Sequence, residues 1–170
     1  MYIQIMYIHR PMRKSKQVAR KTLVADAREA VGHCAGLNVR RAAREITKFI
    51  ETWLVKEGLS LAQFGLLSHV AAARDDTIAG LAERSGLDQS TLSRNLRHLE
   101  VAGLIEIAAV ETDLRRRAVW LTEQGASRLE KAIPAWRLAH GALSKIIAPQ
   151  DVRALANSTM QLSPGDSGKF

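Results

Sequence analysis

The spacing of hydrophobic residues predicts helices along most of the chain. Between Asn38 and Gly58 the apolar positions recur at steps of three and four residues and form one stripe, with the glycine as a stop signal. A second helix is predicted to begin at Ser60, because Gln63 completes a capping box with that residue, and to run to about Ala73. The first of these two helices is long and amphipathic.

Two short helices joined by a tight turn are predicted next. The segment 77–86 keeps apolar residues at helical spacing and ends in Gly86, which can take the left-handed conformation that a short connection needs. The following helix is predicted to start at Asp88, whose carboxylate would accept a hydrogen bond from the free amides of the first turn. Leu87 and Leu92 occupy the two positions of a hydrophobic staple. This order of elements predicts a helix-turn-helix.

The second of the two short helices has two different faces. Its apolar face repeats at i, i+4 and i+7 and holds Leu92, Leu96 and Leu99. Its polar face holds Ser90, Ser93, Arg94 and Arg97. We therefore expect one face to pack in the core and the other to remain free for contact.

After Gly103 the hydrophobic period changes to that of a hairpin. Residues 104–110 are rich in β-branched and apolar types, 111–116 are polar, and 118–121 are apolar again. The predicted loop carries a cluster of arginines beside an acidic residue, namely Arg115, Arg116, Arg117 and Asp113. An arginine at a narrow tip can enter a DNA minor groove, and a neighbouring carboxylate can brace it by a charge-assisted bond.

The C-terminal region predicts two more helices. Thr122 caps the first, which Pro134 should kink near Glu130, and the second follows Pro149. Helices at both ends of the chain carry more apolar surface than a central winged helix of this size can cover. A second copy of the chain is the expected cover, and a monomer that folds these helices onto itself is the alternative.

In this order, the motifs resemble the MarR family of bacterial transcriptional regulators from about Asn38 to Ala139. The resemblance rests on the capped helix before the motif, the run STLSRNLRHLEVAGLI, the D-x-R of the hairpin and the sequence LTEQG. It implies minor-groove insertion by Arg115 with Asp113 as its brace, and a two-fold dimer on successive major grooves. The implied major-groove contacts come from Gln89, Ser90, Thr91, Ser93, Arg94 and Arg97. Many members keep a basic residue where this chain has Ile107.

The predicted fold is mainly α, a winged helix-turn-helix with long N- and C-terminal dimerisation helices. The expected organisation is a basic arm (1–25), an N-terminal dimerisation helix region (26–58), a winged helix-turn-helix DNA-binding domain (59–121), C-terminal dimerisation helices (122–162) and a tail (163–170).

Charge is distributed unevenly along the chain. The net charge is +8, and the first 48 residues hold 11 Lys or Arg against 3 Asp or Glu, so the rest of the chain is neutral. DNA binding must therefore rest on where individual arginines are placed. The basic segment 13–21 would add sequence-independent attraction to phosphates, or would be a solvated tail.

Composition argues against several other classes of protein. A single cysteine excludes an internal disulfide, and the five histidines do not fall at metal-ligand spacing, so no metal or other cofactor is expected. The apolar first residues are too short to span a bilayer and predict no export signal, which favours a cytoplasmic protein without membrane contact. A thiol enzyme built on Cys34 would lack a base other than the adjacent His33, and no catalytic residues are predicted.

These observations predict a dimeric, sequence-specific regulator, acting as a repressor, that binds a pseudo-palindromic double-stranded operator and responds to a small molecule or an oxidant. An aromatic ligand is expected near Trp53, Phe64 and His69, as the family resemblance implies. Cys34 is the candidate redox residue, since a helix N-terminus and nearby arginines favour a thiolate. The alternative function is a winged-helix protein-interaction module, which the near-neutral winged domain and Ile107 favour.

Overall fold

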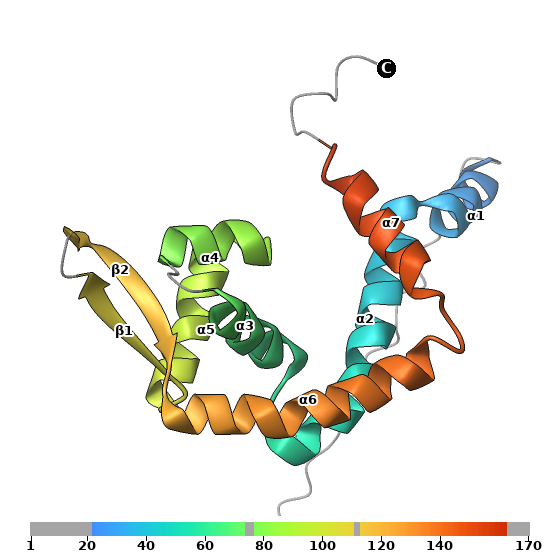
Figure 1. Cartoon of the computed structure of the whole chain (residues 1–170). Helices are drawn as coiled ribbons and strands as arrows, with labels where there is room; N and C mark the ends of the chain where they lie inside the picture. Colours follow the sequence, from blue (N-terminus) through green and yellow to red (C-terminus); the bar gives the residue numbers. More distant parts are fainter. Residues whose placement is uncertain (1–21, 74–76, 111–112, 163–170) are drawn as a thin grey trace, which may run out of the picture. The chain divides into compact units, whose positions relative to one another are not determined.

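The computed structural model describes residues 22–73, 77–110 and 113–162 (Figure 1). The chain divides into two units, residues 1–42 and 43–170, and each is described by itself. Its elements follow in the order α1 (Leu23–His33), α2 (Ala35–Leu54), the 3-10 turn η1 (Val55–Glu57), α3 (Leu61–Ala72), α4 (Ile78–Ser85), α5 (Gln89–Val101), β1 (Ile105–Val110), β2 (Asp113–Leu121), α6 (Glu123–Leu143) and α7 (Pro149–Thr159).

In the first unit, α1 and the start of α2 are exposed. Cys34 separates the two helices in an extended conformation, so the helix predicted from Asn38 begins slightly earlier and another helix precedes it. The side chains of Leu23, Val24 and Val31 face solvent. A helix of 11 residues without a buried side chain has little stability of its own.

The predicted signals at the ends of α2 and α3 are confirmed. The 3-10 turn closes α2, and Gly58 then takes the left-handed conformation, with φ of 67°. Ser60 and Gln63 form the reciprocal capping box at the start of α3. Arg128 of α6 donates a 3.2 Å hydrogen bond to the carbonyl of Glu57, which ties this corner to the C-terminal part of the unit.

The helix-turn-helix is also confirmed. Thr77 caps α4 by accepting from the amide of Gly80, and Gly86 ends this helix with φ of 63°. Helix α5 follows directly with Asp88 as its N-cap. The core beneath these helices joins α2 to α6 and the hairpin; its largest fully buried side chains are Leu54, Leu67, Leu81, Leu92, Leu96, Leu99, Ile105 and Val119.

The predicted hairpin is confirmed, with one correction to its extent. Strands β1 and β2 pair antiparallel from Ile105 opposite Leu121 to Ala109 opposite Arg117, and the register shifts after Ala109. The arginines 115–117, predicted in the loop, lie within β2. Polar composition indicated a loop there, but Asp113 and Arg117 pair with β1 on either side of Arg115 and Arg116 and keep them within the strand. The connection, residues 111–112, lies outside the described residues.

Helix α6 follows the hairpin and starts at the predicted cap, Thr122, whose hydroxyl accepts from the amide of Gly125. The helix continues through Pro134, and the bend near Glu130 stays a prediction. Pro149 occupies the first turn of α7, as expected. Within the described ranges, no helix is long and apolar enough to cross a bilayer.

Candidate nucleic-acid interface

Helix α5 is held by its buried face and leaves a cationic face free. Leu92, Leu96 and Leu99 are buried, whereas Arg94 and Arg97 are exposed, as the periodicity predicted. In the described part of the chain neither arginine makes a hydrogen bond or ion pair. Both guanidinium groups are therefore available to a ligand. The other predicted contact residues on this helix are exposed or half-buried: Gln89, Ser90, Thr91 and Ser93.

The first turn of α5 is fixed by Asp88. One carboxylate oxygen accepts from the Thr91 amide at 2.9 Å and from the Ser90 hydroxyl at 2.6 Å, and the other accepts from the Thr91 hydroxyl at 2.7 Å. The Ser90 hydroxyl, followed by the Thr91 amide and hydroxyl, holds the pKa of the Asp88 carboxyl far below its ordinary value of 3.8. The cap is therefore ionised at neutral pH.

We expect the Asp88 carboxyl to titrate below pH 3.8 in a carbon-13 NMR titration. Because its pKa is lower in the folded protein than in the unfolded chain, the cap contributes stability above the unfolded value and loses it as pH falls through the folded value. Ser90→Ala removes the largest cause of the shift and should move the Asp88 midpoint upward. An unchanged midpoint in that variant would contradict the assigned hydrogen bonds.

The β1–β2 hairpin forms the wing, and its side chains alternate between the core and solvent. Ile105 is buried and Ile107 packs against the core, so the position where the family resemblance implies a basic residue faces inward here, and Glu106 faces outward. Trp120 lies opposite Glu106 and is 41% exposed. The sequence analysis did not single out this aromatic residue, although the period of two along the strand places it on the outward face. Thr77 forms an isolated bridge to Ala118, which joins the start of α4 to the wing.

Of the predicted wing arginines, Arg117 is exposed opposite Ala109. Asp113 pairs with Val110 through the backbone, and Arg115 and Arg116 lie in the same strand. The side chains of these last three residues lie outside the described part of the structure. Bracing of Arg115 by Asp113 therefore stays a prediction.

Hydrogen bonds join α5, the wing and α6 at one corner. The amide of Leu104 donates to the carbonyl of Leu99 at the end of α5, and the carbonyl of Leu104 accepts from the amide of Thr122. The Thr122 hydroxyl also donates to the carbonyl of Gly103 at 2.7 Å. Gly125 packs directly against Leu104, where an added Cβ would meet the carbonyl oxygen. This corner fixes the wing relative to the helix that carries the arginines.

A cavity of about 340 Å³ lies among α2, α6 and α7. Trp136 lines it and stacks on Phe64, with ring centroids 5.9 Å apart. The ring centroids of Trp136 and His140 are 4.5 Å apart. The lining combines apolar and polar side chains: Ile46, Trp136, His140, Leu143, Ser144, Ile147, Pro149, Val152 and Arg153. Trp136 and His140 lie four residues apart in a predicted helix and therefore on the same face of it. This spacing was the signal from which the sequence could have predicted the cavity wall.

The residues predicted for a ligand site are not brought together at this cavity. Phe64 is buried in the core and reaches the cavity only through Trp136. Trp53 is half-buried against the core, and His69 is partly exposed on α3. Their role in ligand binding stays a prediction.

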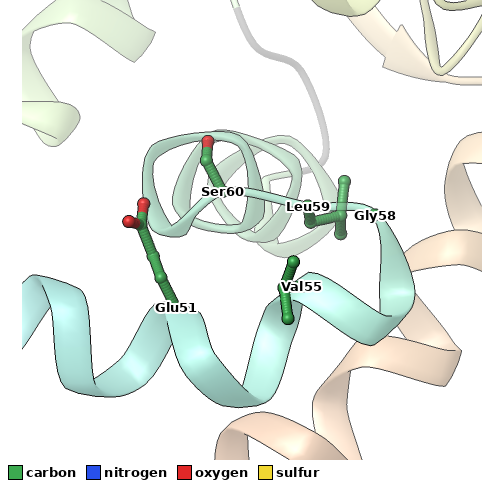
Figure 2. A pocket seen from close by; sticks show the side chains of 5 residues that line it. All are labelled: Glu51, Val55, Gly58, Leu59 and Ser60. Carbon is green, nitrogen blue, oxygen red and sulfur yellow. The ribbon is translucent and has the colours of Figure 1, made fainter.

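A second hollow, of about 350 Å³, lies at the α2–α3 corner, lined by Glu51, Val55, Gly58, Leu59 and Ser60 (Figure 2). The Glu51 carboxylate accepts from the amide of Leu61 at 3.2 Å. This acidic side chain therefore satisfies the first turn of α3, and we assign the corner a structural role.

Cys34 is exposed between α1 and α2, where its carbonyl accepts from the amide of Asn38. The position agrees with the predicted start of a long helix. No group of three or more His, Cys, Asp or Glu side chains within residues 22–73, 77–110 and 113–162 could hold a metal ion. A redox role for Cys34 stays a prediction.

Comparison with known proteins identifies the family. The MarR family model matches residues 57–116. An uncharacterized HTH-type transcriptional regulator of Bacillus cereus is 30% identical over 104 residues, which make up 61% of this chain and 69% of that protein. The transcriptional regulator MosR of M. tuberculosis, solved in complex with DNA, is 31% identical with a TM-score of 0.68, over 76% of this chain and 100% of that chain.

A more distant structure shares the fold. The PcaV transcriptional regulator of Streptomyces coelicolor, solved with its natural ligand, is 19% identical with a TM-score of 0.67, over 77% of this chain and 92% of that chain. The relatives are transcriptional regulators and not enzymes. With the free arginine face of α5 and the paired wing, these similarities show that the chain belongs to the MarR family of winged helix-turn-helix, DNA-binding transcriptional regulators.

Proposed function

We propose that this regulator is a homodimer that binds a pseudo-palindromic operator in the cytoplasm and represses transcription until an effector releases it. The observation that carries the proposal is the pair Arg94 and Arg97, which have no partner among the described residues and lie on the exposed face of a helix whose opposite face is buried. Guanidinium groups in this setting suit guanine edges in a major groove. The relative MosR, solved with DNA, supports the same use of the fold.

The dimer is supported by apolar surface on both terminal helices. On α1 and the start of α2, Leu23, Val24, Val31 and Leu37 are exposed; on α7 and just after it, Val152, Leu155, Met160 and Leu162 are exposed. Exposed apolar side chains gathered on a helix are costly in water and favour association. A two-fold dimer would present two α5 helices to half-sites about one DNA turn apart.

The experiment that tests this function is recovery of genomic fragments bound to the full chain, with sequencing and with solution mass measured by light scattering. We expect twice the chain mass and one enriched inverted repeat, protected from nuclease in two patches on neighbouring turns. A dimer that enriches no sequence would contradict operator binding and favour the protein-interaction alternative. A monomer would contradict the two-fold arrangement.

The effector site we propose is the cavity among α2, α6 and α7. Its volume of about 340 Å³ lies within the range of small-molecule sites, and its apolar walls surround a few polar groups. Trp136 offers an aromatic surface, while Arg153 and His140 can hold an anion. A planar aromatic carboxylate matches both features. The regulator PcaV, of the same fold, was solved with its natural ligand.

We expect an aromatic carboxylate to change tryptophan fluorescence and to release operator in the same concentration range. Arg153→Ala should weaken that ligand about tenfold, because a charge-assisted bond is lost. Lys145→Ala removes one exposed cation that does not line the cavity and is the matched control. Equal affinity in both variants would contradict this binding site.

An oxidant is the second candidate effector, because the thiol of Cys34 is exposed. The chain has no other cysteine, so oxidation would end as sulfenic acid, a mixed disulfide or a bond between subunits. Peroxide should release operator from the parent protein and not from Cys34→Ser. Equal release from both would remove the oxidant from the proposal.

A further inference from the structure

The hydroxyls of Ser90 and Thr91, in the first turn of α5, both donate their hydrogen atoms to the carboxylate of Asp88. Ionised Asp88 carries no hydrogen, so it can only accept. The Ser90 and Thr91 hydroxyls lie 2.6 Å and 2.7 Å from its oxygens, and each must therefore donate its single hydrogen inward. Only oxygen lone pairs remain for an outside partner.

This arrangement changes what the first turn of α5 can recognise. Ser90 is exposed and Thr91 half-buried, on the helix that carries Arg94 and Arg97. Phosphate oxygens, guanine O6 and N7, and thymine O4 all accept hydrogen bonds, so none of them can pair with a hydroxyl that has already donated. The exocyclic amino groups of adenine and cytosine can donate to these oxygens.

We propose that Asp88 is a specificity-determining positioning residue, which makes the first turn of α5 accept rather than donate hydrogen bonds at the DNA surface. The inference rests on the proposed operator binding and deepens it. At the base pair that faces this turn, it favours adenine or cytosine amino groups. Asp88 does this through Ser90 and Thr91, without a contact of its own to DNA.

Asp88→Asn separates this role from simple helix capping. Asparagine caps helices about as well as aspartate, so its side-chain oxygen can keep the bond to the Thr91 amide. Its amide group donates, however, and would turn the Thr91 hydroxyl outward as a donor. Glu100→Gln removes the same charge from an exposed site at the other end of α5 and controls for reduced repulsion from phosphates.

The test measures full-chain affinity for the operator with each base pair varied in turn. Relative to the parent, Asp88→Asn should shift preference about three- to tenfold toward bases with acceptor edges at one position per half-site, as expected for one hydrogen bond. Glu100→Gln should raise affinity for all duplexes alike. In a Ser90→Ala/Thr91→Val background, Asp88→Asn should leave base preference unchanged and match Glu100→Gln. Thermal unfolding confirms that each variant is folded.

Unchanged base preference in Asp88→Asn, with selective binding by the parent, would overturn this inference and leave operator binding intact. A shift that persists in the Ser90→Ala/Thr91→Val background would also overturn it, because the hydroxyls would not be the cause. A folded parent that binds every duplex equally would contradict operator binding and this inference together. If Asp88→Asn unfolds, Asp88→Ser takes its place, because serine keeps a capping oxygen but lacks the two acceptor oxygens of the carboxylate. The inference then requires the same shift in base preference from Asp88→Ser.

Discussion

Arg94→Ala and Arg97→Ala are each expected to weaken operator binding by about 1–3 kcal/mol, or roughly 5- to 150-fold, and to relax selectivity at one base pair per half-site. The reason is geometric: both side chains are exposed, unpaired within the described residues and mounted on a helix that Leu92, Leu96 and Leu99 fix in the core. Where an arginine reaches a guanine, its replacement by alanine removes two directed hydrogen bonds to the base. Fluorescence anisotropy with operator and random duplexes at several salt concentrations measures both effects.

Lys131→Ala is the matched control, because it removes one exposed cation outside α5 and the wing. It should change affinity little. Arg115→Ala should differ from the α5 variants by weakening all sequences similarly and reducing the salt dependence by about one released counterion. If Arg94→Ala and Arg97→Ala both bind operator as the parent does, α5 is not the reading helix.

Gly125→Ala is expected to lower the free energy of unfolding by about 3 kcal/mol, near the upper end of overpacking costs. Gly125 is buried in the first turn of α6, and the new Cβ would meet the carbonyl of Leu104. Backbone that joins α5 to β1 cannot move aside as a flexible side chain can. Urea denaturation followed by circular dichroism gives the loss directly.

The matched control is Gly65→Ala, in the interior of α3, where an added Cβ meets no atom within 4 Å. There alanine should stabilise the protein by about 0.5–1 kcal/mol, since glycine is the poorer helix former. Equal effects of the two substitutions would show that close contact at Gly125 does not constrain the fold. We also expect Gly125→Ala to weaken operator binding under conditions in which it remains folded, because the wing shifts relative to α5.

Local signals predicted the starts of α3, α5 and α6 and the two faces of α5. Capping by Ser60, Asp88 and Thr122 depends on residues within one turn, and burial of the leucine face follows from periodicity. The wing arginines were assigned to a loop because polarity was the available signal, whereas β2 is set by pairing with residues further back in the chain, with Arg117 opposite Ala109 and Asp113 opposite Val110.

The cavity could not be predicted in the same way. Its walls come from residues as far apart as Ile46 and Arg153, so packing of three helices creates it. Sequence analysis selected Phe64 as a ligand contact because it lies near the junction of the dimerising helices and the winged domain, where the family resemblance implies an aromatic ligand. The structure buries that ring and stacks it on Trp136, and its role in binding stays a prediction.

The hydrogen bonds from Leu99 through Leu104 to Thr122 have a consequence for how a signal could reach DNA. The end of α5, the start of the wing and the start of α6 are joined by these backbone hydrogen bonds, so a displacement of α6 carries α5 and the wing with it. A molecule bound against α6 should therefore multiply the dissociation constants of all operators by a common factor. The rank order of the operators should stay the same, and the cell's response would be graded by how tightly each promoter was bound at the outset.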